Sequence, residues 1–119
     1  MKTTDRGQLT EQACCDYLQQ QGLRLVEQNY RTRGGEIDLI MREGDTWVFV
    51  EVRFRKNARY GSAVESVTAA KQQRILRTVE HYCQQHGITQ AVRIDIVGMQ
   101  YDHRQQYRFD WIQNALMAG

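Results

Sequence analysis

The sequence contains no proline, no internal repeat, no low-complexity segment and no linker. It has no run that approaches the ~18 apolar residues of a membrane-spanning helix, so we expect no membrane partner. Residues 1–8 lack the apolar region of a secretory signal, and a cytoplasmic location is expected. A chain of 119 residues without a linker is predicted to fold as one domain, residues 1–119, around a single core.

Cysteine is also scarce. Cys14, Cys15 and Cys83 make an odd number, which does not suit a disulfide framework. The adjacent Cys14 and Cys15 cannot chelate one ion as a C-x-x-C pair does, and the three histidines have no catalytic or metal-ligand spacing. The sequence therefore offers no thiol or histidine site, and the cysteines are interpreted as core thiols in a reducing compartment.

Two strands joined by a tight turn are predicted between Glu36 and Phe54. The segment 36–41 alternates apolar and polar residues, and the segment 47–54 is rich in the β-branched and aromatic residues that strands prefer. Gly44-Asp45 between them has the composition of a two-residue hairpin loop.

This register places Asp38 directly opposite Glu51, on the same face as Glu36 and Arg53. Like charges opposed across neighbouring strands destabilise a sheet, so a sequence selected only for folding would avoid the pair. A divalent cation between the two carboxylates is the compensation that we expect. A four-residue loop keeps the same pairing, whereas a loop of odd length would move Asp38 away from Glu51.

Basic residues gather around this hairpin, although the net charge of +2 says little about partners. Seven of the sixteen lysines and arginines fall in one stretch: Arg31, Arg33, Arg42, Arg53, Arg55, Lys56 and Arg59. A basic surface beside an acidic pocket suits a ligand with a phosphate backbone. The alternative is a solvated basic rim without a ligand.

Hydrophobic periodicity and stop signals define the other elements. They are a helix over 8–21, a strand over 23–29, a helix over 69–86 capped by Thr68, and strands over 91–99 and 107–112. Between them we expect a basic loop over 30–35, a mobile ligand-carrying loop over 55–67, and a tail after Gln113 that frays or forms a helical turn. Asp95 is interpreted as a hydrogen-bonded structural residue.

Two charged residues on the helices have positions that permit a role in a site. Glu11 lies at the edge of the buried stripe of the first helix, from which it can approach the sheet. Its alternative role is that of a first-turn acid that complements the helix dipole. Lys71 lies in the first turn of the second helix, where the dipole disfavours a cation, which hints at use. Its alternative is a solvated surface lysine.

The predicted order α-β-β-β-α-β-β describes an α/β core in which a central mixed sheet, flanked by two helices, carries the acidic hairpin. With Asp38 on one strand and Glu51-Val52-Arg53 on the next, the chain resembles the PD-(D/E)xK nuclease superfamily, which has the restriction-endonuclease-like fold. It resembles more closely the YraN family of small bacterial proteins, which is similar to Holliday-junction resolvases in fold. The runs that carry this likeness are Gly35–Ile40, Val48–Arg53, Tyr60-Gly61, Glu65–Thr68, Lys71-Gln72 and Arg93–Val97.

The resemblance implies Mg²⁺ or Mn²⁺ held by Asp38 and Glu51, with Glu11 as a third ligand or water-holder. Arg53 takes the superfamily's lysine position, which is a departure, because arginine stays protonated and cannot act as a general base. It can still stabilise a pentavalent phosphate or orient water. The implied catalytic residues are Asp38, Glu51, Arg53 and Glu11, and the residues expected to contact nucleic acid are Arg33, Arg55, Lys56, Arg59 and Lys71.

Three functions stay open at this point. The first is a metal-dependent nuclease that hydrolyses phosphodiester bonds, with DNA, including branched DNA, as the expected partner. The second is a nucleic-acid-binding module with weak or no catalysis, and the third is a protein-interaction domain on the same fold. Acidic residues at all three positions favour the first function, and the substituted lysine favours the second. The residues do not decide between DNA and RNA or between a monomer and a homodimer.

Overall fold

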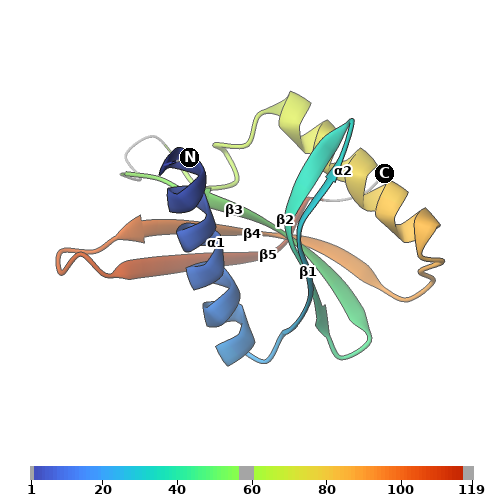
Figure 1. Cartoon of the computed structure of the whole chain (residues 1–119), viewed down its shortest axis with the longest axis horizontal. Coiled ribbons are helices and arrows are strands. Elements are labelled where there is room, and N and C mark those ends of the chain that lie inside the picture. Colours follow the sequence, from blue (N-terminus) through green and yellow to red (C-terminus); the bar gives the residue numbers. More distant parts are fainter. Residues whose placement is uncertain (1, 57–60, 117–119) are drawn as a thin grey trace.

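The computed structural model of the chain describes residues 2–56 and 61–116, with only the backbone described for residues 2–6. The elements, labelled in Figure 1, are α1 (Lys2–Gln20), β1 (Arg24–Thr32), β2 (Gly35–Glu43), β3 (Thr46–Phe54), α2 (Ala69–Gln85), β4 (Val92–Tyr101) and β5 (Tyr107–Leu116). The predicted order α-β-β-β-α-β-β is confirmed. Within the described residues, neither helix is long and apolar enough to cross a membrane.

All five strands form one mixed sheet in the order β1-β2-β3-β4-β5. β3 and β4 run parallel, and the other neighbouring strands run antiparallel. Parallel neighbours need a crossover connection, and the segment that contains α2 provides it. The mixed α/β architecture expected from the sequence is therefore the observed one.

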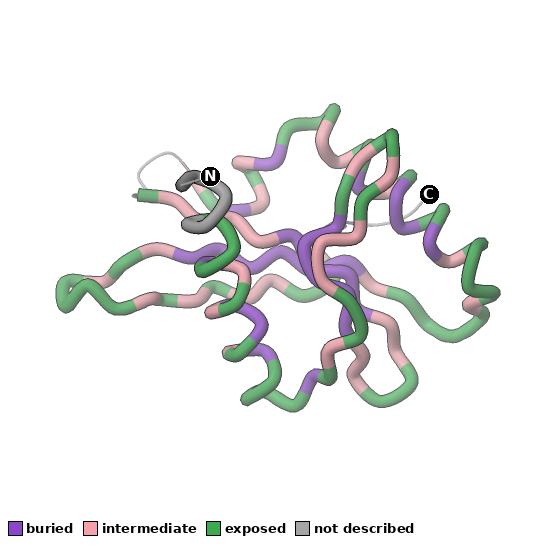
Figure 2. Tube along the Cα trace, viewed as in Figure 1, coloured by how far each residue is buried: buried purple, intermediate pink, exposed green. Residues whose placement is uncertain are grey.

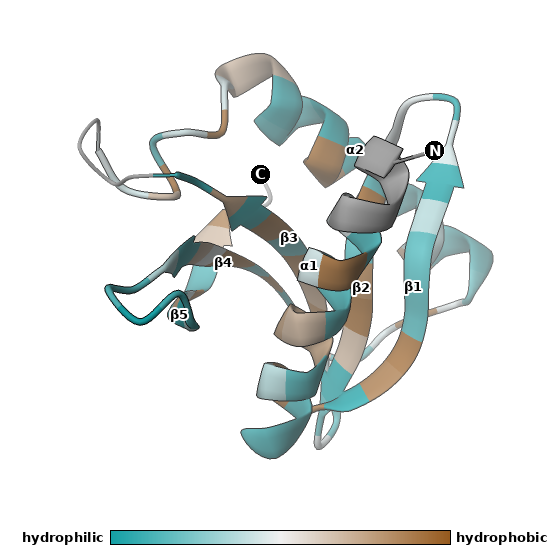
Figure 3. Cartoon of the chain, turned by 60° about the vertical axis from the view of Figure 1, so that its left-hand side comes forward, coloured by the Kyte–Doolittle hydropathy of each residue, from teal (hydrophilic) through white to brown (hydrophobic). Residues whose placement is uncertain are grey.

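The two helices cover opposite faces of the sheet, and each builds its own core. α1 packs Leu18 against a cluster that includes Val50, and α2 packs Ile75 against a cluster that includes Phe49. Figure 2 shows that the buried residues gather in the middle of the molecule, and they include the middle residues of β2, β3 and β4. The turn between β4 and β5 lies away from both cores and is hydrophilic in Figure 3.

Alternation along β3 decides which helix each side chain faces. Val50 contributes to the core under α1, and its neighbour Phe49 contributes to the core under α2. Glu51 comes two residues after Phe49 and therefore also faces α2. There the side chain of Lys71 reaches it.

The β2–β3 hairpin has the predicted register over the half nearest its turn. Glu43 pairs with Thr46, and Leu39 pairs with Val50. Gly44 opens the two-residue turn with a φ of 59°, a left-handed conformation that glycine adopts without steric cost. The loop is thus of even length, as the predicted pairing requires.

β1 extends further than the sequence predicted, and the expected basic loop over 30–35 is wrong. The strand continues to Thr32, so that only two residues turn the chain into β2. Tyr30 pairs with Ile37 and packs edge-on against Tyr82 of α2, with ring centroids 5.0 Å apart. This packing against α2 favours the extended backbone over the loop that the local composition suggested.

β5 is also longer than predicted, and the expected frayed or helical tail after Gln113 is wrong as far as Leu116. The strand runs to Leu116, which is buried and pairs with Ile94 of β4. The backbone amide of Asn114 donates to the carboxylate of Asp95, at 2.8 Å. Residues 117–119 of the tail lie outside the described part of the chain.

Asp95 is the structural residue that the sequence suggested. It is fully buried in β4. Its carboxylate accepts hydrogen bonds from the Arg93 guanidinium at 3.0 and 3.1 Å, from the Trp111 indole at 2.9 Å and from the Asn114 amide. The side chain therefore fastens β5 to β4, at the end of the sheet away from β1.

Asp95→Ala should lower the free energy of unfolding by about 3–5 kcal/mol, because it leaves a guanidinium and two N–H donors without their buried acceptor. Urea denaturation measures the change. Asp110→Ala on the exposed side of β5 is the matched control and should stay within about 0.5 kcal/mol of wild type. Equal losses in the two variants would contradict the structural role of Asp95.

Candidate functional site

Asp38 lies where β2 separates from β3. The last pair of the ladder is Leu39 with Val50, one step before the predicted pair of Asp38 with Glu51. Beyond it, the Val52 amide donates to Asp38 Oδ2 at 2.7 Å, so a side chain takes the place of a backbone acceptor. Asp38 is only 7 % exposed. The Asp38 carboxylate is therefore buried at the point where β2 and β3 separate, which we call the opening between these strands.

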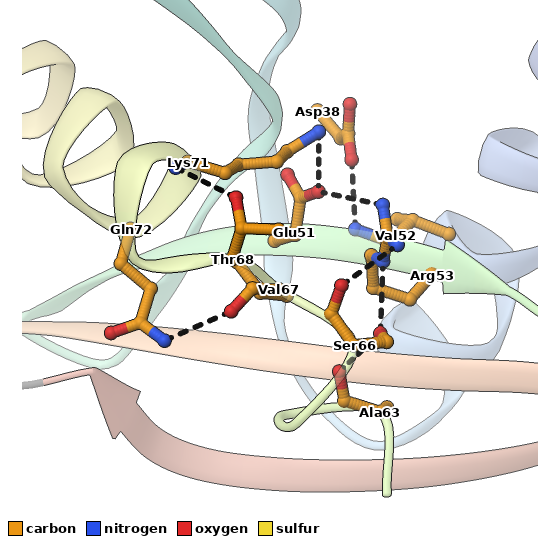
Figure 4. A network of polar contacts seen from close by, with 10 residues as sticks. All are labelled: Asp38, Glu51, Val52, Arg53, Ala63, Ser66, Val67, Thr68, Lys71 and Gln72. Carbon is orange, nitrogen blue, oxygen red and sulfur yellow. Dashed lines mark hydrogen bonds and ion pairs between the residues drawn. The ribbon is translucent and has the colours of Figure 1, made fainter. Parts of the chain in front are cut away.

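Glu51, the second carboxylate, is 4 % exposed and faces α2. Its Oε2 atom lies 3.1 Å from the Lys71 ammonium and 4.0 Å from the Arg53 guanidinium. Figure 4 marks both contacts. Lys71 sits in the first turn of α2, where its backbone amide donates to the Thr68 hydroxyl that caps the helix. The unfavourable dipole position of Lys71 is therefore offset by a nearly buried partner.

Arg53 is bound mainly to the turn that precedes α2. Its Nε donates to Ser66 Oγ and its Nη2 to the Ser66 carbonyl, both at 3.2 Å. Ser66 Oγ in turn donates to the Ala63 carbonyl at 2.6 Å. Figure 4 shows this chain of contacts running from Arg53 to the turn. Arg53 thereby fixes the start of α2 and, through it, the position of Lys71.

Glu11 approaches the same place from α1, on the other face of the sheet. Its Oε1 atom is buried and has no hydrogen-bond partner among the described residues. Burial raises the pKa of Glu11, while hydrogen bonding to Asp38 and Asn29 lowers it. α1 begins at Lys2, earlier than the predicted helix over 8–21, so Glu11 lies in its third turn and the predicted alternative of a first-turn acid is wrong.

The carboxylates of the site are electrostatically coupled. Burial raises the pKa of Asp38 well above its ordinary value, and the charge of Glu51 raises it further. The hydrogen bond from Val52 opposes this shift, and the charge of Glu11 adds to it. Because a buried anion next to another anion favours a proton or a cation, the site calls for positive charge.

A hard divalent cation suits these donors in kind, since Mg²⁺ and Mn²⁺ prefer carboxylate oxygens. The orphaned Glu11 Oε1 is the atom that most needs such a partner. As the side chains stand, no three acidic, histidine or cysteine groups in the described part of the chain are gathered closely enough to form a metal site. An ion held by Asp38, Glu51 and Glu11 together would therefore require at least one of these side chains to shift.

Two of the basic side chains predicted to contact nucleic acid share a groove. Arg33 and Lys71 line the same hollow between the β1–β2 turn and α2. Arg55 lies elsewhere, and its guanidinium donates to a backbone carbonyl of the loop that follows it. Lys56 is exposed next to Arg55 in the sequence, and Arg59 falls outside the described residues, as does the segment 57–60 of the predicted mobile loop.

Three residues that belong to the site were missed by the sequence reasoning. Asn29 of β1 has a φ of 55°, and its side chain lowers the pKa of Glu11. Asparagine tolerates this left-handed backbone, but no pattern in the strand announced it. Ser66 anchors Arg53, and Arg74 lines the hollow with Lys71. The signal for Arg74 was its place one turn after Lys71, which puts both residues on one side of the helix.

Residues 10–99 match the sequence profile described as "Uncharacterised protein family UPF0102". A UPF0102 protein of Colwellia psychrerythraea is 41 % identical over 116 residues, covering 95 % of this chain and 89 % of the relative. One of Aeromonas hydrophila is 49 % identical over 113 residues, covering 92 % and 83 %. The chain belongs to the UPF0102 family, so the small bacterial family predicted from the motifs is confirmed.

Among solved structures, the chain is similar to Pyrococcus furiosus SfsA in complex with Ca²⁺. The TM-score is 0.46 and the sequence identity is 11 %. The similarity covers 97 % of this chain and 65 % of SfsA, so this chain spans less than two thirds of the length of that protein.

Without metal, Asp38→Asn should be as stable as wild type or more stable, by a few tenths to about 1 kcal/mol. Asparagine keeps an acceptor for the Val52 amide and removes the like-charge contact with Glu51. A raised pKa means that the folded state holds the Asp38 proton more tightly than the unfolded state does. Wild type should therefore lose stability as the pH rises above ~3.9, the pKa of an unfolded aspartate, and the advantage of the variant should grow. Urea denaturation in EDTA across this pH range measures it.

Added Mn²⁺ should reverse the ranking. The melting temperature of wild type should rise, because an ion bound only by the folded state stabilises it, and that of Asp38→Asn should not. Asp45→Asn, in the exposed hairpin turn, is the matched control and should respond to Mn²⁺ as wild type does. A melt that Mn²⁺ does not change, together with a destabilised Asp38→Asn, would show that Asp38 is only structural.

Proposed function

For this member of the UPF0102 family we propose the function of a metal-dependent nuclease that hydrolyses phosphodiester bonds in nucleic acid, with DNA as the substrate. The supporting observation is the pair of buried carboxylates, Asp38 and Glu51, at the opening between β2 and β3, with the ammonium of Lys71 on Glu51. Membership of the PD-(D/E)xK superfamily and a cytoplasmic location belong to the same proposal.

Asp38 and Glu51 would hold Mg²⁺ or Mn²⁺, and Glu11 would provide a third oxygen. When bound, such an ion lowers the pKa of a coordinated water and neutralises charge on the phosphate. Neighbouring groups of the chain orient these carboxylates. The Val52 amide donates a hydrogen bond to Asp38, and the side chains of Lys71 and Arg53 lie next to Glu51. Burial keeps both carboxylates away from bulk water, which strengthens their attraction for a cation.

Lys71 is our candidate for the role of the superfamily's lysine. Its ammonium lies 3.1 Å from Glu51, whereas the Arg53 guanidinium is 4.0 Å away and donates two hydrogen bonds to Ser66. A lysine offers a compact charge with three rotatable donors, which can orient a water or contact a phosphate oxygen. Arg53, the departure in the motif, then acts as a positioning residue rather than a catalytic one.

A second candidate function is a nucleic-acid-binding module without catalysis. The ion pair of Lys71 with Glu51 favours it, because this contact offsets part of the acidic charge without any metal. In that case the carboxylates would stabilise the arrangement of α2 on the sheet, and the basic residues would do the binding.

Cleavage assays distinguish the two functions. Purified protein should cut at least one of single-stranded, duplex, flap or four-way-junction DNA in Mn²⁺ or Mg²⁺, and EDTA should stop the reaction. Lys71→Gln should lower the rate at saturating DNA by about 10²–10³-fold, the usual effect of losing a group that acts on the transition state. Arg53→Lys should lose less, since a lysine can keep one of the contacts with Ser66.

Arg104→Gln is the matched control, because it removes a positive charge from the exposed β4–β5 turn. It should cleave at the wild-type rate. Binding of DNA without cleavage of any of these substrates in either metal would reject the nuclease and favour the binding module. A Lys71→Gln variant as active as Arg104→Gln would reject the assignment of Lys71 while leaving the nuclease in place.

A further inference from the structure

A basic groove adjoins the carboxylates on the α2 side. It is a hollow of about 360 Å³ between the β1–β2 turn and the first half of α2. Four of its lining side chains are cationic and one is acidic: Arg31, Arg33, Lys71, Arg74 and Glu36. Lys71 is shared, because it lines the groove and also contacts Glu51. The groove and the candidate site therefore lie next to each other, with Lys71 at the boundary between them.

The turn that forms one wall of the groove is held in place. The Thr32 hydroxyl accepts from the Gly34 amide at 3.1 Å and donates to the Gly35 carbonyl at 3.2 Å. Gly35 lies so close to α2 that a Cβ there would come within 2.8 Å of the Thr78 hydroxyl and 3.3 Å of the Arg74 carbonyl. Glycine at this position therefore permits the close approach of the β1–β2 turn to α2.

The charges in the groove are not balanced within the protein. Arg31 pairs with Glu36 at 3.2 Å, and Lys71 pairs with Glu51. The guanidinium groups of Arg33 and Arg74 make no ion pair or side-chain hydrogen bond with any residue of the described ranges 2–56 and 61–116, and both side chains are exposed. Two arginine forks from opposite walls thus remain available to an anion.

We infer that this groove binds a backbone phosphate of the nucleic-acid strand, adjacent to the phosphate that is acted on at Asp38 and Glu51. The inference rests on the proposed function and names its substrate contact. The planar fork of arginine matches two phosphate oxygens at once, and its charge does not vary with pH. Lys71, between the groove and Glu51, puts the bound phosphate and the reacting one next to each other on the strand.

The test measures binding in EDTA, where cleavage cannot occur. Fluorescence anisotropy with single-stranded and duplex DNA of one sequence, each with and without a 5′-phosphate, is compared for wild type and the double variant Arg33→Gln/Arg74→Gln. The variant should bind at least about tenfold more weakly at low salt, and its salt slope should be shallower by about 1, because one phosphate contact is lost. The loss should be the same with and without the 5′-phosphate, since the groove takes an internal phosphodiester.

Arg77→Gln is the matched control. It removes the same group from the same helix, but Arg77 lines a different hollow, next to β4 and β5. It should bind as wild type does, and Arg33→Lys/Arg74→Lys should recover part of the affinity. Equal binding by the double variant and Arg77→Gln would overturn the inference, as would a loss confined to 5′-phosphorylated strands. A different result would reject the nuclease proposal: wild-type protein that binds DNA but cleaves none of the substrates.

Discussion

The hydrogen bond from the Val52 amide to the Asp38 carboxylate is the contact on which the site depends. It stands where the β2–β3 ladder stops, one step beyond Leu39 and Val50, and it gives the amide of one strand an acceptor from a side chain of the other. The bond fixes the direction of a carboxylate that is almost completely buried beside Glu51. Because burial and Glu51 both raise the pKa of Asp38, the fold itself creates a demand for positive charge at this point.

The two helices place charged side chains near Asp38 and Glu51 from opposite faces of the sheet. α2 places Lys71 on Glu51, and Arg53 holds the start of α2 through Ser66. α1 instead adds a third acid, Glu11, with a buried oxygen that has no hydrogen-bond partner in the described part of the chain. A site for a metal ion alone would need only the carboxylates, and a site for a phosphate alone would need only the cationic side chains. The combination suits a metal ion and a phosphate held together, with the basic groove continuing from Lys71.

Local patterns in the sequence were sufficient for the order of elements and for the hairpin register, because Gly44-Asp45 sets the loop and alternation sets the faces. They could not give the ends of β1 and β5, which depend on Tyr30 packing on Tyr82 and on Leu116 pairing with Ile94. The motif predicts Arg53 near Glu51, where its guanidinium is found 4.0 Å away, but not the closer contact of 3.1 Å from Lys71. A motif counts positions along one strand, whereas Lys71 arrives from a helix, and only the packing of α2 reveals it.

The most direct measurement is the anomalous scattering of Mn²⁺ in crystals of the protein grown with the ion. If Asp38 and Glu51 hold the ion, a peak is expected in contact with both carboxylates, with the Lys71 ammonium displaced from the Glu51 oxygen that it now contacts. The absence of a peak between these carboxylates at saturating Mn²⁺, with Lys71 still paired to Glu51, would contradict the central claim that this pair is built to hold a metal ion.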